Sequence, residues 1–547
     1  MAGDSNVLSR DSATPVRSPV VETASGRIVG TTANGVHIFK GIPYGASTAG
    51  ANRFMPPRAP APWPGIRESS AYAGRSPQAA AAPQRPELAT VWGPVDILPV
   101  GEDCLTLHVW TPGIDNAKRP VMVWLHGGAF SYGSANSPRY DSTNLARRND
   151  VVVFAVNHRL NIFGHLDLSA IGGERFAQSG NAGVLDLVAA LRWIREHAAR
   201  FGGDPGNVTI FGQSGGGGKV CALLAMPEAK GLFHKAIVQS GASVRFAERE
   251  RTARLAEAVL KQLGLKRGQL EELQALPLQR LQEAVDPAQR SLPRPKLPLL
   301  DRYNFGPVID GNVLPAQPFD PAAPAISDDI PVMVGGTKDE SAIFLAPDDA
   351  VWNRAITEDE LRKRIEAVAG SAAGELIAWY KRQYPDASAS DRLITMLTAS
   401  NFGVRSTLLA ERKAARGKAP VFMYSLDWET PAYGGRLKSP HSLDVPFVFD
   451  TLHVIGEQHH KPGAQALADR VSKTWATFAR SGDPQNDSIP AWPAYSADRR
   501  ATMSFNDSCK VVDDPDGGAR PLWIKAATTP TEQPSVMSAL RPLFSKS

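Results

Sequence analysis

The stretch that decides the fold reads Val-Thr-Ile-Phe-Gly-Gln-Ser-Gly-Gly-Gly-Gly-Lys-Val-Cys-Ala-Leu-Leu-Ala and covers residues 208–225. Its apolar beginning, 207–211, predicts a buried strand, and its apolar end, 220–226, predicts a helix. The segment between them, 212–216, has the pattern Gly-x-Ser-x-Gly. After a strand and before a helix, this pattern is typical of a sharp turn that presents a serine hydroxyl. Glycines suit the flanking positions, because side chains would clash in such a strained turn.

Ser214 at the centre of this turn is the candidate nucleophile. The next backbone N–H, from Gly215, is placed where an oxyanion would form. The same glycines also suggest a phosphate-binding loop, which would need glycines at 213 and 218, lysine at 219 and Ser or Thr at 220. The chain has Gln213 and Val220 instead. The first glycine and the magnesium-binding hydroxyl are missing, so the sequence argues against a nucleotide site.

The segments around this turn alternate between strand and helix patterns. Apolar residues recur at helical spacing over 183–200, and this predicts a long helix. Short runs that are apolar on both faces predict buried strands at 120–125, 151–156, 236–239, 331–334 and 421–424. Strand-like patterns also occur earlier, at 26–30 and 36–39. This order predicts the α/β class, with a large, mostly parallel central sheet and helices on both faces.

One domain accounts for nearly the whole chain. Residues 1–19 are polar and are predicted to form a flexible tail, and 20–547 are predicted to form a single α/β domain. The Pro- and Ala-rich stretch 56–86 has weak periodicity and is predicted to be mostly loop. Helical insertions are predicted around 244–330 and 345–415, where they would lie over the turn that carries Ser214.

The composition excludes several classes of protein. The 547 residues are 43% hydrophobic and 21% charged, which is ordinary for a globular protein and not for a disordered chain. A net charge of +5 without long basic runs gives no support for nucleic-acid binding. No apolar run approaches the roughly 18 residues of a membrane helix, and the N-terminus lacks the apolar core of a secretory signal. We therefore expect a cytoplasmic protein without a membrane or nucleic-acid partner.

The cysteine content is also consistent with a cytoplasmic protein. Cys104, Cys221 and Cys509 are too few and too scattered for a disulfide framework or a zinc site. The sequence therefore predicts no metal centre.

A second motif, His-Gly-Gly-Ala-Phe at 126–130, follows the predicted strand 120–125. Small residues after a strand allow backbone N–H groups to approach a substrate oxygen closely. An oxyanion hole needs two or three such donors, each contributing about 3 kcal/mol to transition-state stabilisation. Alone, the motif is an ordinary glycine-rich turn. Together with the serine turn downstream, it predicts an oxyanion hole.

A serine nucleophile needs a base, and the base needs an acid that orients it. After the predicted strand 331–334 come Asp339 and Glu340, at the end of a parallel strand where such sheets place functional residues. The residue types alone allow either to be the acid.

Four histidines follow these acids, and any of them could supply the base. His453 lies in an apolar run and is predicted to be packed in the core, whereas His459 and His460 lie in a polar segment predicted to be a solvated loop. His441 lies on a loop beside a proline, which suits a projecting base. On the residues alone, His441 is the best of the four candidates without excluding the others.

Further motifs make the chain similar to a known family. From about residue 21 to 495, it resembles the type-B carboxylesterases, the esterase/cholinesterase branch of the α/β-hydrolases, and among them the bacterial para-nitrobenzyl esterases. The motifs that carry this resemblance are Phe-Lys-Gly-Ile-Pro-Tyr (39–44), Glu-Asp-Cys-Leu (102–105), Asn-His-Arg-Leu (157–160), Phe-Gly-Gly-Asp-Pro (201–205), Phe-Gly-Pro-Val-Ile-Asp-Gly (305–311) and Ser-Gly-Asp-Pro (481–484).

The resemblance implies roles for individual residues. Similarity to the family's Lys-Asp-Glu-Gly segment selects Glu340 as the acid. Similarity to its His-Gly-x-Glu-Leu-Pro segment selects His441 as the base, with Asp444 at the acidic position. Ser240 matches a serine that supports the acid. The oxyanion hole would consist of the backbone N–H groups of Gly128, Ala129 and Gly215.

The chain departs from the family pattern at four places. The serine turn usually reads Gly-Glu-Ser-Ala-Gly, whereas Gln213 and Gly215 flank the serine here. Ser341 stands where glycine is usual. Cys104 occupies a position that is disulfide-bonded in secreted relatives, but no cysteine precedes it, so that bridge cannot form. This agrees with a reducing compartment.

The activity implied by the resemblance is that of a serine carboxylic-ester hydrolase without metal or organic cofactor. It would act through a Ser-His-Glu triad and an acyl-enzyme, with a short-chain or aryl ester and water as its small-molecule partners. The same groups would serve a hydrolase of carbamates, amides or bulky xenobiotic esters. A third alternative is a non-catalytic, cholinesterase-like binding protein, a class that lacks members of the triad.

Overall fold

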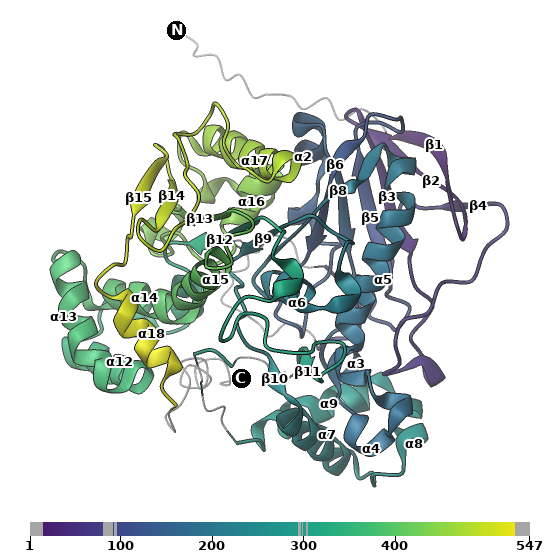
Figure 1. Ribbon diagram of the computed structural model, residues 1–547, viewed down its shortest axis with the longest axis horizontal. Coiled ribbons are helices and arrows are strands. Elements are labelled where there is room, and N and C mark those ends of the chain that lie inside the picture. The colour runs from purple at the N-terminus through teal and green to yellow at the C-terminus, as the bar shows by residue number, and fades with distance from the viewer. Residues whose placement is uncertain are drawn as a thin grey trace.

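A long mixed sheet crosses the molecule, with helices packed on both of its faces (Figure 1). The computed structural model describes residues 15–79, 91, 96–293, 297, 299–301 and 305–530. Within these residues, the strands of the main sheet are β1 (Val16–Thr23), β2 (Gly26–Ala33), β3 (Val36–Pro43), β4 (Ile66–Glu68), β5 (Thr106–Thr111), β6 (Arg119–Leu125), β7 (Val152–Val156), β8 (Gly203–Gln213), β9 (Lys235–Gln239), β12 (Val332–Thr337), β13 (Val421–Leu426), β14 (Ala501–Phe505) and β15 (Lys510–Asp513).

The centre of the sheet is parallel, and its two margins are antiparallel except for the short parallel pair of β2 with β4. The strands follow the order β1-β2-β3-β5-β7-β6-β8-β9-β12-β13-β14-β15, and β4 pairs with β2. Pairing is parallel from β7 through β6, β8, β9, β12 and β13 to β14. The strands predicted from apolar runs are confirmed as β2, β3, β6, β7, β8, β9, β12 and β13. Parallel strands are buried on both faces, which is why their sequences are apolar throughout.

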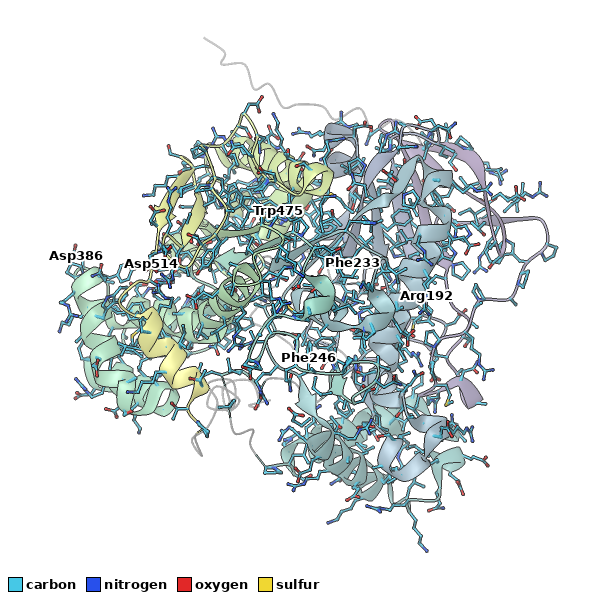
Figure 2. The ribbon with its side chains drawn as sticks, in the orientation of Figure 1. Arg192, Phe233, Phe246, Asp386, Trp475 and Asp514 are labelled. Atoms are coloured by element: carbon cyan, nitrogen blue, oxygen red, sulfur yellow. The ribbon has the colours of Figure 1, made fainter. Side chains whose placement is uncertain are left out.

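The first face of the sheet is covered by α5 (Ala182–His197) and α6 (Gly215–Ala225), and the second by α2 (Thr143–Asn149), α16 (Asp444–Phe449) and α17 (Ala464–Ser481). Alternate side chains of β6 show the division. Val121 and Val123 join the core under α5 and α6, whereas Met122 and Trp124 join the core under α17. Figure 2 shows Trp475 of α17 among these packed side chains and Arg192 of α5 at the surface.

Two helical regions extend beyond the sheet. Between β9 and β12 lie α7 (Arg249–Leu263), α8 (Leu270–Ala275), α9 (Leu278–Arg290) and a small pair of strands, β10 (Ala247–Glu248) and β11 (Val308–Ile309). Together with α3 (Asn161–His165) and α4 (Ser169–Gly172), these helices surround a separate apolar cluster. Between β12 and β13 lie α10 (Ser341–Leu345), α11 (Asp349–Trp352), α12 (Glu358–Ala369), α13 (Ala373–Gln383), α14 (Ala389–Thr398) and α15 (Val404–Ala414), and α18 (Arg520–Thr528) lies beside them.

At the N-terminus, the structure corrects one expectation. Residues 16–19 were predicted to belong to a flexible tail, but they form the beginning of β1 and pair with β2. Sparse burial explains the error, because most of the β1 side chains face outward and only Ser18, Val21 and Thr23 are buried. Most of the predicted tail, 1–14, lies outside the described residues, as does part of the predicted loop 56–86. None of the helices in the described part of the chain has the length and apolar content needed to cross a bilayer.

Candidate active site

The candidate residues come together at the carboxyl ends of the parallel strands. Leu125 at the end of β6 lies opposite Gly212 of β8. Gln213 lies opposite Gln239 of β9, which in turn lies opposite Gly335 of β12. The segments that follow these strands therefore start at the same edge of the sheet, as parallel sheets require. They carry the His-Gly-Gly turn, Ser214 and Glu340.

Ser214 occupies a strained turn between β8 and α6. Its backbone has φ 57° and ψ −122°, a conformation that side chains rarely adopt and that persists only where the surroundings enforce it. The Ser214 N–H donates to the carbonyl oxygen of Gln239 at 2.8 Å, and its carbonyl accepts from Gly218 N–H at 3.1 Å. A Cβ at Gly216 would lie 1.9 Å from the carbonyl oxygen of Leu125. Only glycine allows α6 to start this close to β6.

The predicted oxyanion turn packs directly against this serine. Gly128 and Ala129 have consecutive positive φ values of 91° and 54°. A Cβ at Gly215 would lie 2.0 Å from the carbonyl oxygen of Ala129, and one at Gly127 would lie 3.5 Å from the Cβ of Ser214. The structure therefore brings Gly128, Ala129 and Gly215 together. Among the described residues, no hydrogen bond uses the N–H of Gly128 or Ala129 as donor, which leaves both available to a substrate oxygen.

Glu340 and His441 form a buried pair. His441 Nδ1 lies 2.5 Å from Glu340 Oε2, and both side chains are almost fully buried. Because a carboxylate oxygen accepts, Nδ1 carries a proton, so Nε2 is the atom that holds the lone pair in the neutral ring. The other oxygen of Glu340 accepts the N–H of Thr337 at 2.8 Å, so the carboxylate is fixed at both ends.

The alternative acid, Asp339, meets the backbone of the His441 loop two residues before the histidine and does not reach the imidazole. It is buried, and the Ser439 N–H donates to its Oδ2 at 3.4 Å. Burial raises the pKa of Asp339 to about 6. Of the two adjacent acids that the residues left open, the structure therefore brings Glu340 to the histidine.

The other three histidines lie elsewhere, and two of them contradict their predicted surroundings. His453, predicted to be packed, is exposed. His459, predicted to lie in a solvated loop, is fully buried, and its backbone carbonyl accepts from Thr430 Oγ1 at 3.2 Å. His460 Nε2 donates to the carbonyl oxygen of Leu452 at 2.8 Å. Local polarity misled the sequence prediction here, because partners distant in the sequence satisfy the polar atoms of this segment.

Three neighbours of His441 were not predicted from the sequence. Gln213 Nε2 lies 3.3 Å from His441 Nε2, so the amide of the residue before Ser214 lies beside the ring. Phe344 of α10 and Phe402 lie with their ring centroids 5.1 and 5.0 Å from that of the imidazole. Phe344 follows Glu340 by one helical turn, which was a usable signal. Phe402 lies in a π-helical turn, Ala399–Gly403, a feature that the sequence pattern does not reveal and that often marks functional sites.

Ser240 and Asp444 lie close to the acid. A Cβ at Gly336 would be 2.3 Å from Glu340 Oε1 and 3.0 Å from Ser240 Oγ, which places this hydroxyl beside the carboxylate. Ser240 Oγ has no hydrogen-bond partner among the described residues. Asp444 Oδ2 accepts from Gln239 Nε2 at 2.8 Å and from the Tyr424 hydroxyl at 2.9 Å. Burial, together with repulsion from Glu340, raises the pKa of Asp444 to about 6.

The three cysteines are free, and Cys104 and Cys221 are buried. Burial raises the pKa of each of these two thiols to about 12, so neither is a reactive thiolate at neutral pH. No group of three potential metal ligands occurs among the described residues.

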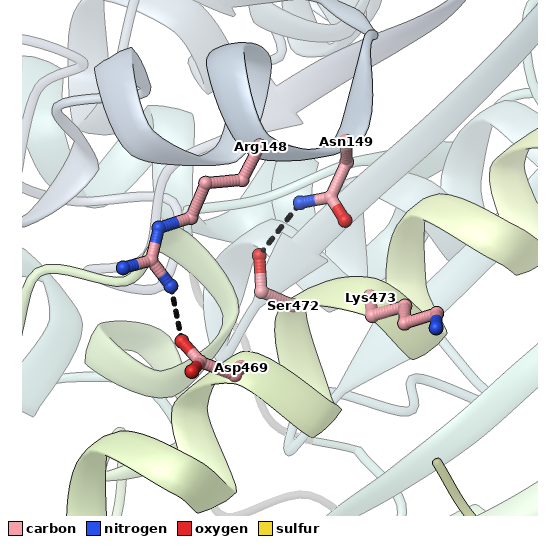
Figure 3. Close-up of a pocket in the computed structure, with 5 residues that line it drawn as sticks. All are labelled: Arg148, Asn149, Asp469, Ser472 and Lys473. Carbon is pink, nitrogen blue, oxygen red and sulfur yellow. Dashed lines mark hydrogen bonds and ion pairs between the residues drawn. The ribbon is translucent and has the colours of Figure 1, made fainter. Parts of the chain in front are cut away.

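A shallow surface pocket lies apart from these residues, between α2 and α17 (Figure 3). Arg148 and Asp469 form an ion pair across it, and Asn149 Nδ2 donates to Ser472 Oγ at 3.1 Å. These contacts join the two helices to each other. None of the lining residues is a candidate site residue.

A strained serine between a central parallel strand and a helix, with helices on both faces of the sheet, defines an α/β-hydrolase. The model of the Carboxylesterase family matches residues 17–518. The chain belongs to this family, and the protein is a carboxylic-ester hydrolase.

Individual relatives cover almost the whole chain. The para-nitrobenzyl esterase of Bacillus subtilis (strain 168) is 36% identical over 92% of this chain and 97% of its own length. A phenmedipham hydrolase of Pseudarthrobacter oxydans is 33% identical over 90% of this chain and 96% of its own. Among solved structures, the Geobacillus stearothermophilus carboxylesterase EST55 is 39% identical, with a TM-score of 0.79 over 92% of this chain and 99% of its own.

Proposed function

We propose that the protein hydrolyses short-chain or aryl carboxylic esters by a Ser214–His441–Glu340 triad through an acyl-enzyme intermediate. The observation that carries this proposal is the pairing of His441 Nδ1 with Glu340 Oε2 at 2.5 Å, beside the strained turn that holds Ser214. In the neutral imidazole, this pairing assigns the lone pair to His441 Nε2. It is therefore the atom able to take the serine proton.

The proposed reaction has two stages. Ser214 Oγ attacks the ester carbonyl while His441 Nε2 takes its proton, and the carbonyl oxygen becomes an oxyanion. The N–H groups of Gly128, Ala129 and Gly215 stabilise this oxyanion, and Gly215 adds the positive end of the α6 dipole. His441 then returns the proton to the departing alcohol. In the second stage, His441 takes a proton from water as the water oxygen attacks the acyl carbonyl, and it passes this proton to Ser214 Oγ as the carboxylic acid departs.

The test uses intact-mass labelling with a fluorophosphonate, which reacts with activated serines, in parallel with turnover of p-nitrophenyl acetate and butyrate. Wild type is expected to gain one adduct and to turn over both esters. Ser214→Ala is expected to gain none and to lose about a million-fold in kcat. Ser472→Ala is the control for labelling, since it removes a buried serine that contacts Asn149 and lies apart from the candidate residues, and it should still gain the adduct.

Two outcomes would contradict the proposal. Substantial turnover by folded Ser214→Ala would show that another nucleophile acts. A folded wild type that neither labels nor turns over would favour the non-catalytic binding protein. Because one relative is named a phenmedipham hydrolase, phenmedipham is the second substrate to assay. Faster turnover of phenmedipham than of the p-nitrophenyl esters would change the proposed substrate class but not the proposed triad.

A further inference from the structure

A lysine is buried behind the predicted oxyanion turn. Lys219 of α6 is completely inaccessible to solvent. Its Nζ donates to the carbonyl oxygen of His126 at 2.8 Å and lies 5.6 Å from the centroid of the Phe130 ring. Among the described residues, no carboxylate forms an ion pair with it. A buried ammonium without a counter-charge costs folding free energy, so its presence needs a compensating role.

The contacts of Lys219 lead directly to the oxyanion turn. His126, whose carbonyl accepts from Lys219, donates from its ring Nδ1 to the carbonyl oxygen of Gly127 at 2.7 Å. The carbonyl of Gly127 and the N–H of Gly128 belong to one planar peptide unit and point in opposite directions. Holding that carbonyl therefore fixes the direction of the Gly128 N–H. A Cβ at Gly216 would lie 3.0 Å from the His126 carbonyl oxygen, so α6 packs closely under the turn.

Three imidazoles surround the lysine, and none of them supplies a positive charge. His158 stacks on His126 at a centroid distance of 5.0 Å, and His165 meets the Phe130 ring edge-on at 5.3 Å. Burial lowers the pKa of His126 and His158 well below the usual range and that of His165 to about 3.

Two more charged groups of the described residues lie beside this cluster, Arg159 and Asp186, and they neutralise each other as a buried pair at 2.6 Å. Burial lowers the pKa of Lys219 to about 7. Around neutral pH, Lys219 is thus the group whose charge varies in this cluster.

We propose that Lys219 is a positioning residue for the oxyanion hole: its ammonium anchors the His126–Gly127 peptide and sets a positive charge behind the turn that stabilises the tetrahedral oxyanion. This inference rests on the proposed function of the turn. Charges act strongly in a buried environment of low dielectric constant. A bound neutral ester carries no charge for the ammonium to stabilise, whereas the oxyanion does. The effect therefore belongs to kcat and not to KM.

The experiment compares Lys219→Met with Lys413→Met. Lys413 of α15 is a matched control, because it is also a buried lysine that donates to backbone carbonyls, those of Ser327 and Asp328. Lys219→Met is expected to lose about 10- to 100-fold in kcat, somewhat less than the loss of a direct oxyanion donor, with KM within about twofold. Its melting temperature is expected to stay within a few degrees of wild type. Lys413→Met should keep wild-type kcat and ketone affinity.

Two further readouts separate an electrostatic role from mere packing. A trifluoromethyl ketone binds serine hydrolases as a charged hemiketal, so Lys219→Met should weaken its binding by the same factor as kcat. For wild type, this binding should weaken as the pH rises through about 7, where the Lys219 ammonium loses its proton. The second measurement needs no variant and stays informative if Lys219→Met fails to fold.

The proposal is overturned if folded Lys219→Met keeps wild-type kcat and ketone affinity, or if wild-type ketone binding does not weaken across that pH range. Fluorophosphonate labelling of wild type at Ser214 distinguishes this failure from failure of the proposed function. If wild type is labelled and Lys219→Met keeps wild-type kcat and ketone affinity, only the proposed role of Lys219 is refuted. If wild type is not labelled, the proposed Ser214–His441–Glu340 triad is refuted.

Discussion

Replacement of Gln213 by glutamate would place a carboxylate beside the proposed catalytic base. In the structure, the Gln213 amide nitrogen lies 3.3 Å from His441 Nε2, and the side chain is almost fully buried. Glutamate differs from glutamine mainly in its charge, so it should occupy the same space. A negative charge there favours the imidazolium over the neutral imidazole. The base would then stay protonated, and inactive, up to a higher pH.

The distance sets the size of the effect. At the 3.3 Å between Gln213 Nε2 and His441 Nε2, the attraction between unit charges is about 1.3 kcal/mol at the dielectric constant of water and about 5 kcal/mol at an effective value of 20. A change of 1.36 kcal/mol moves a titration by about one pH unit. Burial of the new carboxylate and the nearby charge of Glu340 offset the upper value. We therefore expect the acidic limb of kcat/KM to move upward by about one to two pH units.

The assay is the pH profile of kcat/KM for p-nitrophenyl butyrate between pH 5 and 9, because this parameter reports ionisations of the free enzyme. Gln213→Met is the control: it fills the same space without charge and should not move the acidic limb upward. An acidic limb that stays in place or moves to lower pH in Gln213→Glu would refute the placement of this side chain against the base.

Two other predictions concern buried charges. Glu340→Gln should lower kcat by about 10³- to 10⁴-fold with little change in KM, because an amide no longer selects the productive tautomer of the histidine. Steady-state kinetics on the folded variant test this, and a loss of less than tenfold would exclude an orienting role. Asp186→Asn should lower the free energy of unfolding by about 3–5 kcal/mol, because it leaves Arg159 buried without its counter-charge. Urea unfolding measures this loss, and Glu250→Gln in the exposed pair with Arg254 should change little; equal effects of the two variants would refute the argument.

The parallel strands could be predicted because burial on both faces requires continuous apolar sequence. Thr106–Thr111 forms the fully buried strand β5 but was not predicted, since threonines and His108 interrupt its apolar pattern. His108 is tolerated there because its Nδ1 accepts the N–H of Gly41 at 3.0 Å and its Nε2 meets Asn136 Oδ1 at 2.9 Å. These partners come from distant segments, so the sequence around His108 does not predict them.

The site shows the same division between local and long-range information. Ser214 could be predicted from its own neighbours, since the strained turn, the strand and the helix are contiguous. The choice between Asp339 and Glu340 could not, because it depends on which of the two side chains reaches the imidazole of His441, about 100 residues later. The resemblance to a family supplied that choice, and the structure brings Glu340 to His441. Lys219 belongs to the same glycine-rich stretch, but its burial could not be predicted from the sequence, because it depends on how α6 packs under the turn.

The separation of these partners along the chain has a consequence for how the protein acquires activity. Gln213 and His441 are in contact although they are 228 positions apart, and Glu340 and His441 are separated by 101. Contacts between such distant residues form slowly, since long loops must close before the contacts contribute. During renaturation, the helices should therefore regain their circular dichroism before the protein regains esterase turnover. Turnover would then report the last long-range assembly step, and truncated chains that end before β13 would acquire helices without catalysis.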